Sequence, residues 1–235
     1  MDIIHYVIGD IHGQVEKLET LLDMIKSHHE RKHSNKTGRL VYLGDYIDRG
    51  PNSAAVIDLI MQARDGFDAV YLKGNHEALM LDAITKDDTA AWRVWMSLGG
   101  KPTLKSFDYD LVEEEFNTDK LKQKVGRQRL EWLSDLKLSY QYDDFLCVHA
   151  GLMPHIRLNM QIEKDMLWIR RRFLDSNYDF GLGIIHGHTP ESAPVVKSNR
   201  IGIDTGAGMG GDLTALVVDQ PWRDLVATPV FLSAS

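Results

Sequence analysis

The chain has 235 residues, of which 43% are apolar and 26% are charged, a composition typical of a globular protein. This composition excludes a wholly disordered chain, and the net charge of −7 argues against a nucleic-acid binder, which needs a basic face. A single cysteine, Cys147, excludes an intramolecular disulfide and a cysteine-rich zinc module, so we expect it to be a small apolar strand residue.

The sequence indicates neither a targeting segment nor a membrane span. Residues 1–6 lack the basic segment and the long apolar run of a signal peptide. No stretch approaches the roughly 18 consecutive apolar residues that a membrane-spanning helix requires. We therefore expect a soluble, cytoplasmic protein that contacts no membrane.

Short apolar runs alternate with amphipathic segments through the first third of the chain. Buried strands are predicted at Ile3–Ile8, Leu40–Leu43 and Ala69–Leu72. Helices are predicted at Val15–Lys26, Ser53–Arg64 and Glu77–Ile84, where apolar residues recur at helical spacing. Strands that alternate with helices through short connections predict parallel βαβ units and a layered α/β sheet.

The middle of the chain, from about residue 85 to 139, is polar and mostly helical in pattern. We interpret it as a helical insertion or cap within a single domain of residues 1–235, and expect its tryptophans to pack in the core or the cap. Strands return after it, at Phe145–Val148, Gly183–His186, Val195–Lys197, Leu213–Val218 and Pro229–Leu232.

Five short polar clusters stand where predicted strands end. They read GDIHG at 9–13, GDYIDRG at 44–50, GNHE at 74–77, HAG at 149–151 and HGHTP at 186–190. Each cluster alone has an ordinary interpretation, since these residue pairs favour turns and a lone histidine after a strand is often structural. Together they place Asp, Asn or His beside Gly at strand ends, which meet at one edge of a parallel sheet. We therefore expect one shared site.

The side chains of these clusters form a ligand set of oxygen and nitrogen without sulfur. Its six members are Asp10, His12, Asp45, Asn75, His149 and His188. Six ligands exceed the need of one tetrahedral zinc, and a shared carboxylate would let them hold two metals. Two divalent ions suit an in-line displacement at phosphorus, and Arg49 offers a fixed fork for phosphate oxygens.

In these motifs the sequence resembles the calcineurin-like metallophosphoesterases, and within them the phosphoprotein phosphatase group. The resemblance runs in order from Gly9 to about Val217. It implies an α/β sandwich of mixed β-sheets flanked by helices, with a helical insertion. It also implies hydrolysis of phosphomonoesters by direct attack of a metal-bound hydroxide on phosphorus, most simply in a serine/threonine protein phosphatase. Two alternatives remain open: a symmetrical dinucleoside polyphosphate hydrolase or other phosphoesterase, and a binding scaffold that has lost catalysis.

The resemblance also implies roles for individual residues. Asp10 and His12 would bind the first metal, Asp45 would bridge, and Asn75, His149 and His188 would bind the second. His76 would be the general acid, with Asp48 orienting its imidazole. Phosphoryl oxygens would contact Arg49, Asn75 and Arg170, and the neighbouring Arg171 and Arg172 compete for the place of Arg170.

The implied cofactors are two divalent ions, manganese first, with iron, zinc or nickel as alternatives, because such ligands accept several metals. The implied partner is a phosphorylated protein or a small phosphoester, and no nucleic acid.

Three further signals receive ordinary interpretations. His186 is expected to be a core or supporting residue rather than a ligand. The HExxH pattern at 29–33, a zinc-peptidase signature, is interpreted as a chance match on a frayed helix end. The triplet Asp204-Thr205-Gly206 copies an aspartic-protease motif but occurs once, so we expect it to close a turn near the site.

Overall fold

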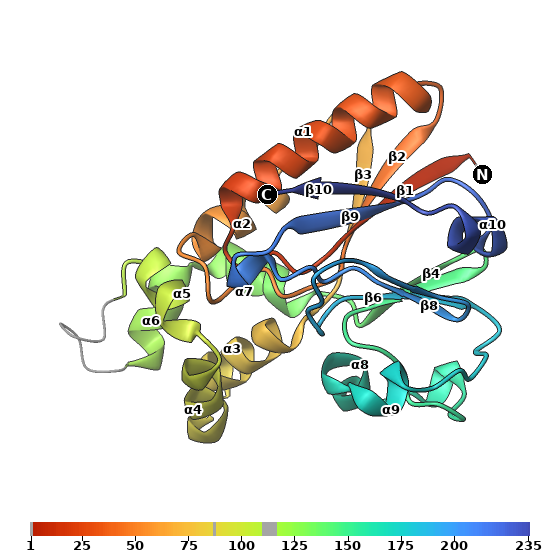
Figure 1. Cartoon of the computed structure of the whole chain (residues 1–235). Coiled ribbons are helices and arrows are strands. Elements are labelled where there is room, and N and C mark those ends of the chain that lie inside the picture. Colours follow the sequence, from red (N-terminus) through yellow and green to blue (C-terminus); the bar gives the residue numbers. More distant parts are fainter. Residues whose placement is uncertain (1, 87, 110–116) are drawn as a thin grey trace.

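Two five-stranded sheets lie face to face in the computed structural model, which describes residues 2–86, 88–109 and 117–235 (Figure 1). The first sheet has the order β10-β9-β1-β2-β3. Its strands are β1 (Ile3–Ile8), β2 (Thr37–Tyr42), β3 (Phe67–Tyr71), β9 (Leu213–Val218) and β10 (Val230–Ala234). The parallel pairing of β1, β2 and β3 confirms the predicted βαβ units, while β9 and β10 are antiparallel to their neighbours.

The second sheet has the order β4-β5-β6-β8-β7, with parallel strands at its centre and antiparallel strands at its edges. Its strands are β4 (Ser139–Tyr142), β5 (Phe145–Val148), β6 (Gly183–His186), β7 (Val195–Lys197) and β8 (Arg200–Gly202). The sequence did not predict β4 or β8. The first alternates polar residues with two tyrosines, and the second has three residues and begins with an arginine, so neither carries an apolar run.

The apolar core between the sheets explains why the strands read as continuous apolar runs. Val7 and Val41 of the first sheet and Ile185 and Ile201 of the second point into this layer. Cys147 lies among them and is fully buried, as predicted. The alternate side chains of these strands point to the outer faces of the sandwich and pack under helices there.

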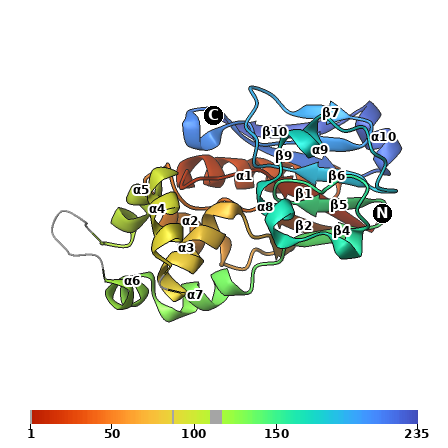
Figure 2. The ribbon, with the colours of Figure 1, turned by 90° about the horizontal axis from the view of Figure 1, so that it is seen from below.

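Helices cover both outer faces of the sandwich. Helices α1 (Val15–Lys32) and α2 (Ser53–Ile60) pack on the first sheet, and α8 (Glu163–Trp168) and α9 (Arg171–Leu174) on the second (Figures 1 and 2). The short α10 (Trp222–Ala227) precedes β10. No helix in the described ranges combines the length and the hydropathy that a membrane crossing needs.

Helix α1 extends six residues beyond its predicted end, so the HExxH pattern at 29–33 lies at the end of a helix, as expected, but its last turn is helical rather than frayed. His29 continues the apolar face of the helix and is buried, with its ring 5.0 Å from that of Phe67. Its Nδ1 lies 3.2 Å from the Tyr6 hydroxyl, and its Nε2 lies 3.0 Å from the carbonyl oxygen of Lys36. His29 therefore packs as part of the buried face of α1.

The middle of the chain forms a group of helices at one end of the sandwich (Figure 2). It follows α3 (Asn75–Thr85) and contains α4 (Thr89–Ser97), α5 (Gly100–Ser106), α6 (Thr118–Val125) and α7 (Arg127–Ser134). These helices share a buried apolar cluster with α1 and the first sheet, to which Trp95 contributes. Residues 87 and 110–116 of the predicted helical insertion lie outside the described residues.

Candidate active site

The loops that follow β1, β2, β3, β5 and β6 converge at one edge of the sandwich and bring the six predicted ligands together. Each of the six is at most 5% exposed: Asp10, His12, Asp45, Asn75, His149 and His188. Burial of so many polar groups is costly unless each has a hydrogen-bonding or ionic partner. The partners of these side chains therefore decide what the site can bind.

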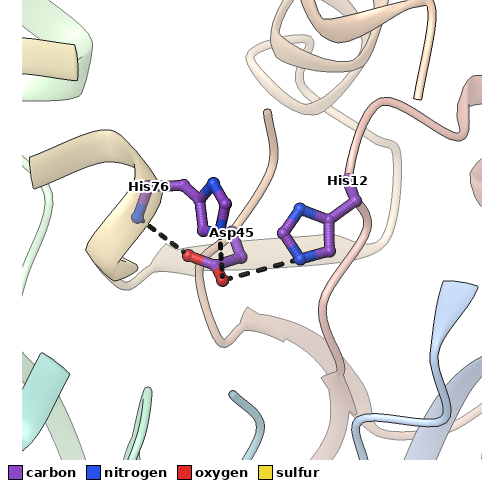
Figure 3. A group of neighbouring side chains, drawn as sticks. All are labelled: His12, Asp45 and His76. Carbon is purple, nitrogen blue, oxygen red and sulfur yellow. Dashed lines mark hydrogen bonds and ion pairs between the residues drawn. The ribbon is translucent and has the colours of Figure 1, made fainter. Parts of the chain in front are cut away.

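Asp45 lies between two groups of histidines. Its Oδ2 lies 3.6 Å from Nε2 of His12 and 3.8 Å from Nε2 of His76 (Figure 3). Its Oδ1 lies 3.4 Å from Nε2 of His149, and His188 completes that second group. Within each group the candidate ligand atoms lie within 4.8 Å of one another. The two groups share Asp45, which is the arrangement that a bridging carboxylate requires.

The donor atoms fit divalent cations because several of them are buried without a partner. Nε2 of His12, Nε2 of His188 and Oδ1 of Asp10 have no hydrogen-bond partner. Nδ1 of His12 donates to the carbonyl oxygen of Ile47 at 2.8 Å, which leaves the Nε2 lone pair free for a metal. Burial lowers the pKa of His12 to about 3 and that of His188 to about 2, so both rings are neutral.

His149 and Asn75 repeat this pattern on the other side. Nδ1 of His149 donates to the carbonyl oxygen of Leu43 at 3.0 Å, so its Nε2 carries a lone pair. That lone pair lies 3.0 Å from Oδ1 of Asn75, and two acceptors this close need a cation or a shared proton between them. Burial lowers the pKa of His149, which favours a cation ligand over a proton.

Asp10 lies on the side of His188 rather than inside either histidine group. Its Oδ2 accepts a hydrogen bond from the backbone N–H of His188 at 3.0 Å. Burial, with the nearby charges of Asp204 and Asp45, raises the pKa of Asp10 well above its ordinary value. Three carboxyl groups in one buried site repel one another, and bound divalent ions would remove that repulsion.

The backbone around the site is left-handed at residues that are not glycine. Five of the eight such residues in the described part of the chain belong to the site: His12, Asp45, Asp48, Arg49 and His188. Such conformations cost free energy and persist where the surrounding structure enforces them. Two glycines make room for the carboxylates, since a Cβ on Gly187 would lie 2.0 Å from Asp10 Oδ1 and one on Gly74 would lie 2.1 Å from Asp45 Oδ1.

His76 and Asp48 form a buried pair beside the first histidine group. Nδ1 of His76 donates to Oδ2 of Asp48 at 2.6 Å. Burial alone would lower the pKa of His76, but the charges of Asp45 and Asp48 and this hydrogen bond outweigh it and raise the pKa. Nε2 of His76 points back toward Asp45 and lies 3.4 Å from Nη2 of Arg49. The ring can therefore hold a proton beside the proposed metals, as the predicted general acid must.

Asp48 is held in turn by the helical group, which sequence reasoning missed. Nε1–H of Trp95 donates to both carboxylate oxygens of Asp48 at 2.9 Å, and the Thr103 hydroxyl donates to Oδ1 at 2.6 Å. The Ser53 hydroxyl accepts from the backbone N–H of Asp48 at 3.0 Å. Trp95 and Thr103 come from α4 and α5, so these helices set the position of the His76–Asp48 pair.

Glu77 is a second residue whose part the sequence did not reveal. Its carboxylate accepts backbone hydrogen bonds from Asp45, Tyr46 and Gly74 at 2.8–2.9 Å. Burial raises its pKa to about 7, and the charge of Asp45 adds to the shift. The only sequence signal for this contact is the acidic residue that closes the GNHE cluster. Glu77 ties the β2 loop to the start of α3 and so positions Asp45.

Arg49 and Arg170 act on different residues of the centre. The charge of Arg49 acts on Asp10, His12 and His76, where it opposes the net rise in the pKa of Asp10 and of His76 and adds to the fall in the pKa of His12; its backbone N–H donates to the carbonyl oxygen of Gly99 at 3.1 Å. The charge of Arg170 instead lowers the pKa of His149 and His188. Nη1 of Arg170 donates to Oγ1 of Thr189 at 3.3 Å.

Two other predicted features take supporting places. His186 is buried with Nδ1 bonded to the Gly187 carbonyl oxygen and Nε2 accepting from Arg200 at 3.2 Å, so its ring faces away from the histidine groups. Oδ1 of Asp204 accepts from the backbone N–H of Gly206 at 3.0 Å. This bond closes a turn beside Asp10, as expected from the sequence.

Known proteins resemble the chain over nearly its whole length. A family model described as calcineurin-like phosphoesterase matches residues 6–211. The chain is 28% identical over 247 residues to a bis(5′-nucleosyl)-tetraphosphatase PrpE [asymmetrical] of Anoxybacillus flavithermus, covering 97% of this chain and 94% of the relative. It is 29% identical over 215 residues to serine/threonine-protein phosphatase 1 of Salmonella typhimurium, covering 89% of each.

Solved structures share the fold. The crystal structure of a candidate diadenosine tetraphosphatase superposes with a TM-score of 0.67 at 20% identity, covering 99% of this chain and 94% of that one. A protein serine/threonine phosphatase of Saccharomyces cerevisiae gives a TM-score of 0.56 at 16% identity, covering 100% and 80%. These likenesses confirm the predicted sandwich of mixed sheets flanked by helices. With a family model that spans most of its length, this chain belongs to the calcineurin-like phosphoesterases and is a hydrolase of the metallophosphoesterase superfamily.

Proposed function

We propose that this enzyme hydrolyses bis(5′-nucleosyl) tetraphosphates. The observation that carries the proposal is the similarity to a bis(5′-nucleosyl)-tetraphosphatase across 97% of this chain and 94% of the relative. Since that relative is described as asymmetrical, the expected products are a nucleoside triphosphate and a nucleoside monophosphate. This replaces the symmetrical cleavage into two diphosphates that the sequence suggested as an alternative.

The geometry supports hydrolysis at phosphorus. Divalent ions, for which we propose manganese, would be held by Asp10, His12, Asp45, Asn75, His149 and His188. When bound, they would supply Lewis acidity at the phosphoryl oxygens and lower the pKa of water. Arg49, beside His76, and Arg170, beside Thr189, would both donate to the phosphoryl group. His76, oriented by Asp48, would give its proton to the oxygen of the departing phosphate.

A serine/threonine protein phosphatase is the second candidate, with a phosphorylated protein as its substrate. It is favoured by the 29% identity to serine/threonine-protein phosphatase 1 of Salmonella typhimurium. It also suits the His76–Asp48 pair, because a serine alkoxide is a poor leaving group and gains much from a positioned proton donor. Neither candidate requires nucleic acid or a membrane.

A direct comparison of substrates tests both candidates. The enzyme would be stripped with a chelator, reloaded with manganese, and given diadenosine tetraphosphate or a phosphoserine peptide at equal concentration. Chromatography of the products should show ATP and AMP from the dinucleotide in equal amounts, at a higher kcat/KM than phosphate release from the peptide. ADP alone would assign symmetrical cleavage. Faster release from the peptide would assign the protein phosphatase, and no turnover of either substrate with metals bound would favour a scaffold. Asp45→Asn serves as the inactive control.

A further inference from the structure

A second cavity lies beside the proposed metal centre, on the outer face of the second sheet. It has a volume of about 280 Å³ and lies between β6, β7 and β8 and the C-terminal end of α9. Its polar lining includes Asp175, Thr189, Glu191, Lys197, Arg200 and Asp204. Drug-sized ligands occupy about 300–1,000 Å³, so this cavity would hold only part of a dinucleotide.

Arg200 forms the floor of this cavity and, among the described residues, makes no direct hydrogen bond or ion pair with a carboxylate. Only 4% of the residue is exposed. Its Nη1 donates to Nε2 of His186 at 3.2 Å, its Nη2 donates to the carbonyl oxygen of Leu174 at 3.0 Å, and its Nε–H has no acceptor. Burial lowers the pKa of His186 to about 3, so that partner is neutral. A buried guanidinium bonded only to neutral groups can still gain an anionic ligand.

The cavity borders the metal centre through two residues. Thr189 follows the predicted ligand His188, lines the cavity, and accepts a hydrogen bond from Arg170. Asp204 also lines the cavity, and its charge raises the pKa of Asp10. A substrate with one phosphoryl group near Arg170 could therefore extend over Thr189 and reach Arg200.

The charges of the cavity match a sugar phosphate better than a bare anion. Arg200 and Lys197 offer donors to a phosphoryl group, and Lys197 is exposed at the rim. Asp175 and Glu191 lie close enough for their charges to act on Arg200, and they offer acceptors for hydroxyl groups. Carboxylates recognise the hydroxyls of ribose in other nucleotide sites. With three acids in the lining, Asp175, Glu191 and Asp204, a phosphate without its sugar would gain less.

We propose that this cavity binds the ribose phosphate of a nucleotide, namely the part of the substrate or product that extends away from the metal centre. The proposal rests on the proposed function for the source of that nucleotide. The phosphoryl oxygens would face Arg200 and Lys197, and the ribose hydroxyls would face Asp175 and Glu191. The cavity would thus distinguish nucleotides from other phosphoesters.

Product inhibition of the manganese-loaded enzyme tests this assignment. Hydrolysis of p-nitrophenyl phosphate would be inhibited by ATP, whose terminal phosphate can lie at the metal centre while its ribose phosphate reaches the cavity, or by inorganic phosphate. The ratio of the two inhibition constants would be compared between wild type, Arg200→Met, Lys197→Met and the matched control Lys26→Met. Inorganic phosphate needs only the metal centre, so the ratio isolates the cavity. We expect the ATP constant to rise relative to the phosphate constant by about ten- to a hundredfold in Arg200→Met and less in Lys197→Met. Lys26→Met should match wild type.

A second comparison isolates the sugar. Glu191→Gln should weaken inhibition by ATP but leave inhibition by 2′,3′-dideoxy-ATP unchanged, because the latter lacks the hydroxyls. Glu191 and Lys197 are exposed, so these variants carry the test if Arg200→Met does not fold.

Equal ratios in all folded variants would overturn the cavity assignment, even if diadenosine tetraphosphate is hydrolysed. Altered ratios in an enzyme that does not hydrolyse diadenosine tetraphosphate would overturn the proposed function but support the nucleotide site.

Discussion

The two halves of the metal centre differ in how tightly the protein holds them. On the side of His76, the carboxylate that orients the imidazole is fixed by buried partners: Asp48 accepts from the imidazole, from Trp95 and from Thr103. Around His188 the arrangement is open. Arg170 is exposed and bonds only the edge of the site at Thr189, and Trp168 beside His188 is 37% exposed.

This difference separates two tasks. A general acid must be held within about 0.5 Å of the position from which it donates its proton, so a buried network that fixes His76 favours catalysis. Substrates of different shapes need an adjustable surface, which the half around His188 and Arg170 provides. We therefore expect substitutions near His76 to act on kcat and those near Arg170 to act on KM, as the variants below test in order of effect.

Asp45→Asn should cause the largest loss because Asp45 contacts both halves. The substitution removes the shared negative charge, so metal content and kcat/KM should fall together, the latter by about 10⁴-fold. Metal content would be measured by mass spectrometry after gel filtration, with exposed Asp23→Asn as the control. An active variant that retains two metals would contradict the bridging role.

His76→Ala should lower kcat by an amount that depends on the leaving group. For phenyl phosphate, whose phenolate is a poor leaving group, we expect kcat to fall by about 10²–10³-fold, within the usual range for general acid catalysis. For p-nitrophenyl phosphate the loss should be much smaller, because nitrophenolate departs without a proton. The two kcat values would be measured on one enzyme preparation, and equal losses would remove His76 from the acid role.

Asp48→Asn should shift the basic limb of the pH profile. The negative charge of Asp48 helps to raise the pKa of His76, against the effect of burial. His76 acts as an acid while protonated, so activity falls as the pH rises through its pKa. Without the negative charge of Asp48 the pKa of His76 is lower, so the loss of activity should begin at a lower pH. At neutral pH we expect kcat to be about 10–100-fold lower than in wild type. The profile of kcat/KM for phenyl phosphate would measure this, and an unchanged limb would contradict it.

Trp95→Phe keeps an aromatic ring but removes the N–H that Asp48 accepts. We expect kcat for phenyl phosphate to fall by about tenfold, and less for p-nitrophenyl phosphate, because the indole acts through Asp48 and His76. Trp92→Phe is the matched control, since Trp92 lies on the same helix and packs edge-on against Trp95. Equal losses on both substrates would indicate that Trp95 serves folding alone.

The sequence predicted the strand-end side chains well because their signal is local. Asp10, Asp45 and His149 each follow an apolar strand and have a glycine within two residues, and parallel strands bring such positions to one edge. The contact of Trp95 with Asp48 had no such signal. A tryptophan in an amphipathic helix fits apolar packing equally well, and only the folded chain brings it to a carboxylate 47 residues away.

The cavity around Arg200 could not be predicted for a related reason. Strand β8 has three residues and no apolar run, so its arginine resembled a loop residue. Helix α1 was underestimated because His29 occupies an apolar position, although its ring packs like an aromatic side chain. Periodicity detects apolar faces, whereas these residues act through polar atoms that the fold buries.

Arg170→Ala should have the smallest effect and should separate the halves most clearly. Arg170 faces His149 and His188 and is exposed, so its loss should raise KM for phosphoesters by about fivefold and leave kcat within about twofold. Arg171→Ala and Arg172→Ala are the matched controls, since both arginines are exposed neighbours in α9. Steady-state kinetics on p-nitrophenyl phosphate would measure all three. A KM effect confined to Arg171 or Arg172 would move the phosphate contact to that residue. A fall in kcat as large as that of Trp95→Phe would mean that the open half also positions the reacting groups.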